Sequence, residues 1–310
     1  MFLLKDITIL KDKKALRDLP KGKLLINTIN AHSYNTALKD ELFAEALVNG
    51  DVLISDGASI VMACKLLRAK SRPTERIAGW DLFVYEMGKL NGNGNDNGNV
   101  DGLGVRVKGD SSQAQNDKTD DNGNDNVEGL GLSVKRGSSQ AQNDRTDGND
   151  DGNVDGLGVS VERIGKKRVM FMGSSEKVLA LIRERAAEDY PNLEVVTFSP
   201  PYKPEFSDED NKQIIDAIND ATPDLLWIGM TAPKQEKWVY VHRDSLNVNC
   251  HIGTIGAVFD FYAGTVKRAP LWWQRHGLEW LYRLLKEPKR MWRRYLVGNV
   301  LFLWNVLTKG

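Results

Sequence analysis

The sequence predicts an α/β fold in which a mostly parallel sheet carries helices on both faces and is followed by a helical, basic and aromatic C-terminal appendage. Short apolar runs alternate with longer segments of helical periodicity, which is typical of a parallel sheet with crossover helices. Residues 91–165 interrupt this alternation and contain no Phe, Trp or Tyr. From residue 264 onward, Trp residues are interleaved with Lys and Arg. These observations favour a Rossmann-like core with one insertion and one appendage.

Each strand of the core is predicted from a short apolar run, and each helix from apolar residues spaced three or four positions apart. The expected strands span residues 23–27, 51–55, 168–172, 194–198, 224–228 and 249–253. The expected helices span residues 32–48, 59–68, 79–89, 175–189, 208–221 and 234–242. Because strands and helices alternate throughout, we expect parallel strands with both faces of the sheet covered.

The insertion differs in composition from the rest of the chain, since Asn, Asp, Gly and Ser dominate it and 14 acidic residues stand against 7 basic ones. An acidic residue followed by Gly-Leu-Gly recurs at positions 101, 128 and 155, a period of 27 residues. Repeats that rely on Leu and Val bury too little surface to offset chain entropy, so we expect a disordered loop. The alternative is a calcium loop beginning at Asp147, but Gly158 occupies the position of its last glutamate ligand.

The chain is therefore expected to have four parts. These are the first half of the core (1–90), the insertion (91–165), the second half of the core (166–263) and the appendage (264–310). Lengthening a loop from about five to about 75 residues costs roughly 2 kcal/mol in closure entropy, so the core can tolerate the insertion.

The net charge of zero conceals a strongly basic C-terminus. From Val266 onward, ten Lys or Arg residues stand against only Glu279 and Glu287. A basic segment of this kind favours an anionic partner, and its content of Trp and Leu is typical of a helix lying in a membrane interface. Residues 296–307 fit such a helix, and no segment reaches the ~20 apolar residues needed to span a bilayer. A nucleic-acid-binding protein is the competing class for such a tail.

The predicted compartment follows from the cysteines and the N-terminus. Cys64 and Cys250 lack metal-ligand spacing and lie in apolar contexts, so we expect buried free thiols in a reducing compartment. Lys5 and Asp6 interrupt the first ten residues and no cleavage pattern follows, so we expect no signal peptide. Together with the basic appendage, this predicts a cytoplasmic protein held peripherally on the inner face of the cytoplasmic membrane.

Polar side chains follow the predicted strands at their carboxyl ends, where ligands bind in open α/β sheets. Thr28 and Asn30 follow the first strand, and Asp56 follows the second and precedes a glycine that would let a ligand approach. From position alone, Asp56 fits a helix N-cap equally well, and Thr28 and Asn30 fit turn or cap residues. Gln235 fits the surface of a first helical turn, and Asp260 fits a cap.

Seven motifs in a fixed order resemble the WecG/TagA/CpsF family, glycosyltransferase family 26. The motifs are Thr28-x-Asn30-Ala31, Asp56-Gly57, Arg76-x-x-Gly79-x-Asp81, Ala232-Pro-Lys-Gln-Glu236, Gly256-x-x-Phe-Asp260, Gly264-x-x-x-Arg268-Ala-Pro270 and Gly277-Leu-Glu-Trp-Leu-Tyr-Arg283. Each motif alone is weak evidence for the family, but a chance match of all seven in the same order is very improbable. The resemblance covers nearly the whole chain apart from the insertion and the N-terminal residues.

The resemblance implies a glycosyltransferase that moves a sugar, often of N-acetylmannosamine type, from a UDP-sugar to a polyprenyl-diphosphate-linked acceptor sugar. It implies inversion at the sugar, no metal and no other cofactor, a role in cell-surface polysaccharide or teichoic-acid-like glycan synthesis, and homo-oligomers in some members. By the same resemblance Asp56 is the general base for the acceptor hydroxyl. The substrate-binding residues that it implies in the core are Thr28, Asn30, Arg76, Gln235 and Asp260.

Without a metal, cationic side chains must neutralise the departing diphosphate, and guanidinium groups suit phosphate oxygens. Matching the family's C-terminal motif gives Arg283, Arg290 and Arg293 as these contacts. Their spacing keeps them roughly on one helical face, although Pro288 is expected to bend the path. Asp208-Glu-Asp210 is the only Asp-x-Asp outside the insertion and fits a helix cap better than a metal site.

Three other classes compete with this interpretation. A dehydrogenase is disfavoured because no Gly-x-Gly-x-x-Gly follows a strand and precedes a helix. A nucleic-acid-binding protein would leave the strand-end residues without a purpose, so we expect no nucleic acid as partner. A catalytically inactive relative, disrupted by the insertion, stays open.

Overall fold

The computed structural model describes residues 2–92 and 165–309 of the chain. Its six strands form one parallel sheet with the order β2-β1-β6-β5-β3-β4. The strands are β1 (Leu24–Ile29), β2 (Val52–Ser55), β3 (Lys167–Gly173), β4 (Leu193–Phe198), β5 (Leu225–Gly229) and β6 (His251–Thr254). The predicted α/β fold with a parallel sheet is confirmed. Nearly all of the expected insertion, with the alternative calcium loop at Asp147 and Gly158, lies outside the described residues.

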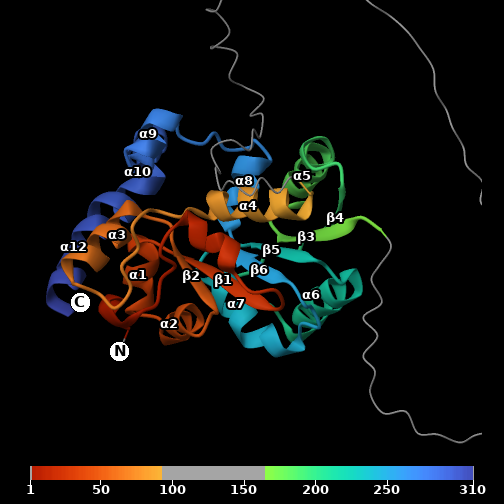
Figure 1. The fold of residues 1–310 in the computed structure, drawn as a ribbon, viewed down its shortest axis with the longest axis horizontal. Helices are drawn as coiled ribbons and strands as arrows, with labels where there is room; N and C mark the ends of the chain where they lie inside the picture. Colours follow the sequence, from red (N-terminus) through yellow and green to blue (C-terminus); the bar gives the residue numbers. More distant parts are fainter. Residues whose placement is uncertain (1, 93–164, 310) are drawn as a thin grey trace, which may run out of the picture. The chain divides into compact units, whose positions relative to one another are not determined.

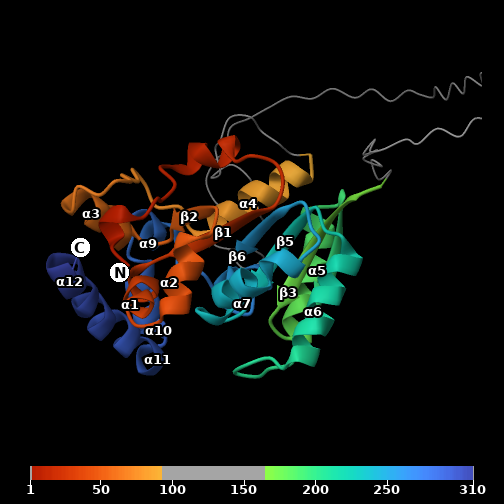
Figure 2. The ribbon, with the colours of Figure 1, turned by 90° about the horizontal axis from the view of Figure 1, so that it is seen from below.

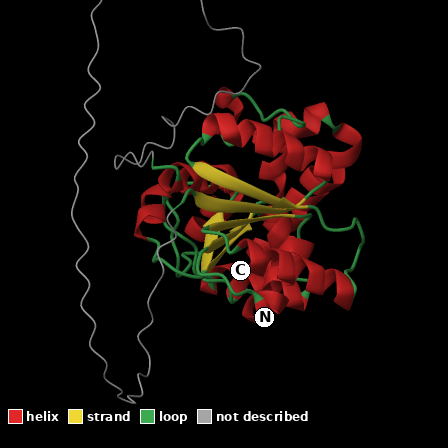
Figure 3. Ribbon diagram, turned by 90° about the vertical axis from the view of Figure 1, so that its right-hand side faces the viewer, coloured by secondary structure: helices red, strands yellow, loops and turns green. Residues whose placement is uncertain are grey.

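Helices cover both faces of the sheet (Figures 1 and 3). One face carries α4 (Gly79–Leu90), α5 (Glu176–Asp189) and α8 (Gly256–Tyr262), and the other carries α2 (Glu41–Val48), α6 (Asp208–Ala221) and α7 (Lys234–His242). Strand β5 shows why both faces need cover, because successive side chains of a strand point to opposite sides. Trp227 packs in a cluster with Phe83 and Tyr262, whereas Leu226 packs with Ile214 and Val239.

The helix expected over residues 32–48 is wrong, because two helices occupy this range. Helix α1 spans Ala31–Ala37, and α2 begins at Glu41. The Asp40 side chain accepts a hydrogen bond from the backbone N–H of Phe43 at 3.0 Å, which caps the start of the second helix. Two short 3-10 turns near the N-terminus, Leu4–Asp6 and Lys13–Asp18, were also not expected.

The C-terminal residues form a series of short helices that ends on the core (Figure 2). They are α9 (Leu271–Arg275), α10 (Glu279–Lys286), α11 (Pro288–Trp292), a π-helical turn (Arg293–Val297) and α12 (Gly298–Lys309). Phe302 of α12 meets Tyr34 of α1 edge to face, with ring centroids 5.6 Å apart. None of the helices within the described ranges is long and apolar enough to cross a membrane.

Helix α12 is also held to α1 by amide groups. Asn35 Nδ2 donates to the carbonyl oxygen of Gly298 at 2.7 Å, and Asn305 Nδ2 donates to Asn35 Oδ1 at 3.1 Å. Directional hydrogen bonds fix the position of a helix more narrowly than apolar contacts do. The end of the appendage is therefore seated on the core in one register.

Both thiols are buried and unpaired, as expected for Cys64 and Cys250. The point at which the insertion leaves the core is also well held. Asn91, directly after α4, accepts a hydrogen bond on its side chain from the backbone N–H of Asn192 at 3.0 Å. Its carbonyl oxygen accepts a second one from the Asn192 side chain at 2.9 Å.

Replacing residues 93–164 with a short Gly-Ser linker should leave the core folded, because the Asn91–Asn192 hydrogen bonds stay in place. If the segment is the disordered loop that its composition predicts, shortening it should raise the free energy of unfolding by about 2 kcal/mol. Denaturant unfolding of the shortened and full-length chains measures this difference. A shortened chain that is less stable by a similar amount would contradict the disordered-loop prediction.

Phe302→Ala should lower the free energy of unfolding by about 3 kcal/mol, because it empties a buried aromatic site against Tyr34. Leu303→Ala on the same helix is the matched control, since Leu303 is exposed and should change the value by less than about 0.5 kcal/mol. Thermal or urea unfolding compares the two. Equal effects would mean that α12 is not held by this contact.

Candidate functional site

Asp56 lies at the carboxyl end of β2, next to the end of β1. Its backbone N–H donates to the carbonyl oxygen of Ile29 at 2.9 Å. Helix α3 (Ala58–Leu66) follows with Gly57 at its N-cap, so the N-cap interpretation of Asp56 is wrong. The carboxyl is half-buried, and none of the described residues donates a hydrogen bond to it. Asp56 is thus free to act on a ligand.

The surroundings of Asp56 make it a weaker acid. Burial raises the pKa of its carboxyl to about 6, although the nearby guanidinium of Arg76 opposes this shift. The negative charges of Glu279 and Asp81 raise the pKa further, and Arg268 lowers it. A general base works best when its pKa lies near the working pH, so this carboxyl suits proton abstraction near neutrality.

Arg76 is held by a residue of the appendage. Its Nη2 lies 3.2 Å from Oε2 of Glu279, the first residue of α10. The other carboxyl oxygen of Glu279 lies 3.6 Å from Nε of Arg268, whose guanidinium is 5.3 Å from the ring centroid of Trp80. Glu279 therefore joins one cation of the core and one cation of the appendage, with its own side chain only 15% exposed.

Asp81 completes this group of charges. Its Oδ2 accepts a hydrogen bond from the backbone N–H of Ala78 at 2.8 Å and so caps α4. Its other oxygen lies 3.3 Å from Nζ of Lys13. Asp81, Arg268 and Glu279 all belong to the sequence motifs, but their roles were missed. The sequence does show that each of these charged residues lies within a motif. It does not show which residues they pair with.

Thr28 lies near the end of β1 and Asn30 directly after that strand, at the same carboxyl edge of the sheet as Asp56. Thr28 pairs with Ile54 in the parallel register of β1 and β2, which places the next two positions of each strand end side by side. Asn30 Oδ1 accepts hydrogen bonds from the backbone N–H groups of His32 and Ser33, both at 3.0 Å. The cap interpretation of Asn30 is therefore confirmed, and its amide nitrogen remains as the group that can face a ligand.

Gln235 is only 4% exposed, so the prediction of a helix-surface position is wrong. Its Oε1 accepts a hydrogen bond from the backbone N–H of Met230 at 3.1 Å, and its Nε2 donates to Glu236 Oε1 at 2.8 Å. A Cβ on Gly256 would lie 2.8 Å from Gln235 Oε1, so only glycine lets β6 and the β5–α7 loop approach this closely. The buried Gln235 side chain thus holds the loop after β5 through its hydrogen bond with Met230.

Glu236 is a buried carboxyl that the sequence did not single out. It is nearly inaccessible to solvent, and its Oε2 has no hydrogen-bond partner among the described residues. Burial raises the pKa of this carboxyl to about 7, although the hydrogen bond from Gln235 opposes the shift. Glu236 therefore adds a second carboxyl with a raised pKa, in the first turn of α7.

Asp260 lies within α8, whose N-cap is Ile255, so the cap interpretation of Asp260 is wrong. Its side chain accepts a hydrogen bond from Thr265 Oγ1 at 3.3 Å. The next residue, Phe261, lies under the guanidinium of Arg283, 5.1 Å from the ring centroid. This contact places Arg283 of α10 against α8, the helix that follows β6.

Arg283 lies on α10, whereas Arg290 and Arg293 lie on the helical stretch that begins at Pro288. The bend expected at Pro288 is therefore present, and it separates Arg283 from the other two arginines. Helix α10 ends at Lys286, Glu287 leaves helical geometry with φ −131° and ψ 59°, and Pro288 starts α11. Arg293 begins the π-helical turn, is exposed and lies 5.4 Å from the ring centroid of Trp292. Arg290 belongs to α11, but its side chain lies outside what the structure describes.

The acidic pair at the start of α6 is used in capping, as expected. Ser207 is the N-cap, and its backbone N–H donates to Asp210 Oδ2 at 2.9 Å while its hydroxyl accepts from the Asp210 backbone at 3.2 Å. Lys203 Nζ pairs with the same carboxyl at 2.8 Å. Within residues 2–92 and 165–309, no three His, Cys, Asp or Glu side chains come together as a metal-binding group.

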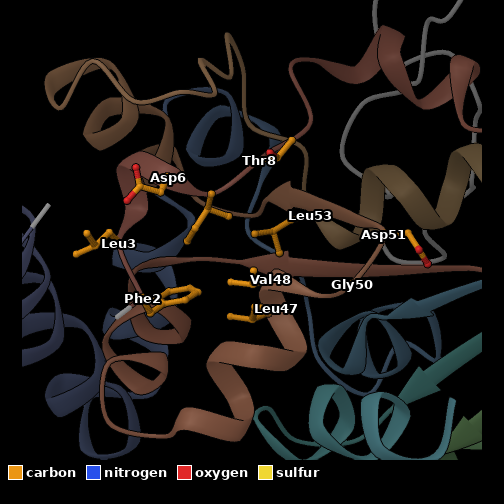
Figure 4. A pocket seen from close by; sticks show the side chains of 10 residues that line it. Phe2, Leu3, Asp6, Thr8, Leu47, Val48, Gly50, Asp51 and Leu53 are labelled. Atoms are coloured by element: carbon orange, nitrogen blue, oxygen red, sulfur yellow. The ribbon is translucent and has the colours of Figure 1, made fainter.

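A cavity of about 240 Å³ lies beside the amino end of β2, between the N-terminal segment and α2 (Figure 4). It is lined by the N-terminal segment, by Leu47 and Val48 of α2, and by Gly50 and Asp51 just before β2. Asp51 at its rim is committed to the backbone N–H of Leu25 at 2.7 Å. Because ligands of parallel sheets bind at the carboxyl ends of strands, this cavity is not part of the candidate site.

The comparisons with known proteins agree on one family. The model of the family described as "Glycosyl transferase WecG/TagA/CpsF family" matches residues 7–96 and 158–310. Several similar proteins carry the name N-acetylglucosaminyldiphosphoundecaprenol N-acetyl-beta-D-mannosaminyltransferase. The protein from Bacillus spizizenii is 37% identical over 131 residues, which is 42% of this chain and 48% of that protein. The match therefore spans about half the length of that relative.

Two further relatives extend the comparison. The Bacillus subtilis protein is 25% identical over 272 residues, covering 88% of this chain and 75% of that protein. The Staphylococcus aureus (strain MW2) protein is 27% identical over 130 residues, covering 42% and 49%. The similarity thus extends across most of the chain only at the lower identity.

Asp56→Asn should stabilise the protein at neutral pH and not at acidic pH. In the folded chain the carboxyl stays protonated up to about pH 6, whereas in the unfolded chain it ionises near pH 4, so its ionisation opposes folding as the pH rises through this window. Asparagine removes the effect, and the variant should gain about 2 kcal/mol over the parent between pH 4 and pH 7.5.

Urea unfolding of both proteins across this pH range measures the difference. The titration of Glu236 is common to both proteins and cancels. Asp220→Asn, an equivalent change at an exposed position on α6, should show no comparable gain. A difference between Asp56→Asn and the parent that stays flat with pH would contradict the predicted shift.

Proposed function

Because the chain belongs to the glycosyl transferase WecG/TagA/CpsF family, we propose that it transfers a sugar to an acceptor sugar linked to a polyprenyl diphosphate. The donor is a UDP-sugar of N-acetylmannosamine type, and the product serves the synthesis of cell-surface polysaccharide or a teichoic-acid-like glycan. The relatives' shared name, which includes a mannosaminyl group and N-acetylglucosaminyldiphosphoundecaprenol, supports this choice. The observation that carries it is the accessible, unpartnered carboxyl of Asp56 at the strand end, with a pKa of about 6.

The proposed reaction is a single displacement with inversion. The acceptor hydroxyl attacks the anomeric carbon of the donor from the face opposite to UDP, and the new C–O bond forms as the bond to the diphosphate breaks. Asp56 takes the proton of the attacking hydroxyl, and UDP leaves with the electron pair. Thr28 and Asn30 lie at the neighbouring strand end, where they can contact the same sugar.

The proposed reaction needs no metal, because arginines neutralise the departing diphosphate. Arg283 is placed against α8 by its contact with Phe261, and Arg293 is exposed at the start of the π-helical turn. Arg290 is assigned the same role from its place in the motif. Bidentate guanidinium groups can bind phosphate oxygens without a bridging cation. Arg76, held by Glu279 beside Asp56, adds positive charge on the core side of the site.

The appendage also supplies a surface for the membrane to which a polyprenyl acceptor is confined. Exposed apolar side chains form an open groove along its last helical turns. The groove is lined by Trp292, Leu296, Val297, Val300, Leu301 and Trp304. Apolar side chains beside basic ones are typical of peripheral attachment to an anionic bilayer, here the inner face of the cytoplasmic membrane. Whether the chain forms a homo-oligomer on this membrane stays a prediction.

A donor screen tests the proposed reaction. Purified full-length protein is mixed with several UDP-sugars and a polyprenyl-diphosphate-linked N-acetylglucosamine, with and without EDTA. We expect transfer from UDP-N-acetylmannosamine or a related hexose, at the same rate in EDTA. Absence of transfer from every donor would overturn the function, and loss of transfer in EDTA would overturn the metal-free chemistry alone.

Asp56→Ala should lower kcat at least 1,000-fold, because proton abstraction from the acceptor is lost. In the parent enzyme, kcat/KM should fall about tenfold per pH unit below about pH 6, where Asp56 becomes protonated. Thermal unfolding serves as the folding control, since the removed carboxyl makes no hydrogen bond among the described residues. Turnover within tenfold of the parent would remove Asp56 as the base.

Glu279→Gln should move the acid limb of the pH–rate profile to lower pH. The negative charge of Glu279 raises the pKa of Asp56, and its loss also frees Arg76 to approach the Asp56 carboxyl. Both changes lower the pKa of the base. Glu209→Gln at an exposed position on α6 is the control and should leave the profile in place. If the acid limb of the variant's pH–rate profile is unchanged or moves to higher pH, the role given to Glu279 is contradicted.

A further inference from the structure

Helix α3, which follows Asp56 directly, presents an apolar face to solvent. Met62 is 71% exposed and Leu66 is 63% exposed, and their spacing of four places both on one side of the helix. The opposite side of α3 is buried through Ile60, Ala63 and Cys64. Met62 and Leu66 therefore form an exposed apolar patch, and such patches often mark sites of binding to a protein or a membrane.

Exposed basic residues lie on α3 and in the loop that follows it. Residues 57–74 contain no Asp or Glu, and their four basic residues are Lys65, Arg68, Lys70 and Arg72. All four are exposed, and none forms an ion pair within the described part of the chain. An unbalanced basic group beside exposed apolar side chains matches the chemistry of an anionic lipid surface.

Helix α3 packs beside the appendage. Ile60 and Cys64 of α3 share one hydrophobic cluster with Phe302 and Val306 of α12. A Cβ on Gly277, in the turn between α9 and α10, would lie 3.3 Å from the Cβ of Ala58. Figures 1 and 2 both show α3 and α12 at the same end of the described core. Helix α3 therefore lies next to the appendage, at the end of the core that the proposed membrane contact covers.

We propose that α3 and the loop after it form a second contact with anionic lipid, which acts together with the appendage to hold the carboxyl edge of β2 against the membrane. This inference rests on the proposed membrane function and goes beyond it, because it assigns lipid binding to the core. A second copy of the chain is a poorer occupant, since a two-fold interface would bring four unbalanced positive charges against four more.

The test is co-flotation of full-length protein with vesicles, without donor or acceptor, so that the result does not depend on sugar transfer. Vesicles of phosphatidylcholine alone are compared with vesicles containing 30% phosphatidylglycerol. The charge variant carries Lys65→Gln, Arg68→Gln, Lys70→Gln and Arg72→Gln, and the apolar variant carries Met62→Gln and Leu66→Gln. Matched controls are Lys177→Gln with Lys212→Gln, and Val241→Gln, all at exposed positions on other helices.

We expect the charge variant to lose at least tenfold in binding to the anionic vesicles, since each basic residue near such a surface contributes about fivefold. The apolar variant should lose binding by a similar factor, and the controls should bind like the parent. Thermal unfolding verifies that every variant is folded. Parent-like binding by both α3 variants would overturn the proposal. A fall in oligomeric state of those variants, seen by light scattering with binding unchanged, would assign the face to a second copy instead.

Discussion

The two ion pairs of Glu279 hold the site together. Its carboxylate forms one ion pair with Arg76 of the core, with an N–O distance of 3.2 Å, and a second with Arg268 of the appendage, at 3.6 Å. A carboxylate taken out of water is costly unless its charge is matched, and here two guanidinium groups share the task. The position of α10, the orientation of Arg76 and the field around Asp56 therefore depend on one side chain. The appendage therefore forms a wall of the candidate site.

Much of this arrangement could be predicted from local sequence. The alternation of apolar runs and helical periodicity gave the parallel sheet, and the strand-end position of Asp56 pointed to the edge where ligands bind. Short-range chemistry explains these successes, since strand and helix patterns need only neighbours in the chain. The interpretation of Asp208-Glu-Asp210 as part of a helix cap rested on the same kind of local pattern, and Asp210 does cap α6 together with Ser207.

The unpredicted features depend on contacts between distant parts of the chain or on single residues that break a helix. Arg76 and Glu279 are separated by 203 positions, so no local pattern could pair them. Gln235 fits a surface helix in the sequence, but it is buried where Gly256 at the start of α8 packs closely against it. Asp40 and Glu287 each interrupt a helix that periodicity would continue. The break at Glu287, next to the bend expected at Pro288, separates Arg283 from Arg290 and Arg293.

The ends of the insertion meet the core at the edge opposite to Asp56, because the connection from α4 leads into the amino end of β3. Tandem repeats are gained and lost readily when DNA is copied, and each 27-residue unit changes the chain without shifting the reading frame. At this edge such changes would leave the carboxyl ends of β1 and β2 untouched. A change in the number of repeats would therefore lengthen or shorten only a connection that begins and ends away from the candidate site.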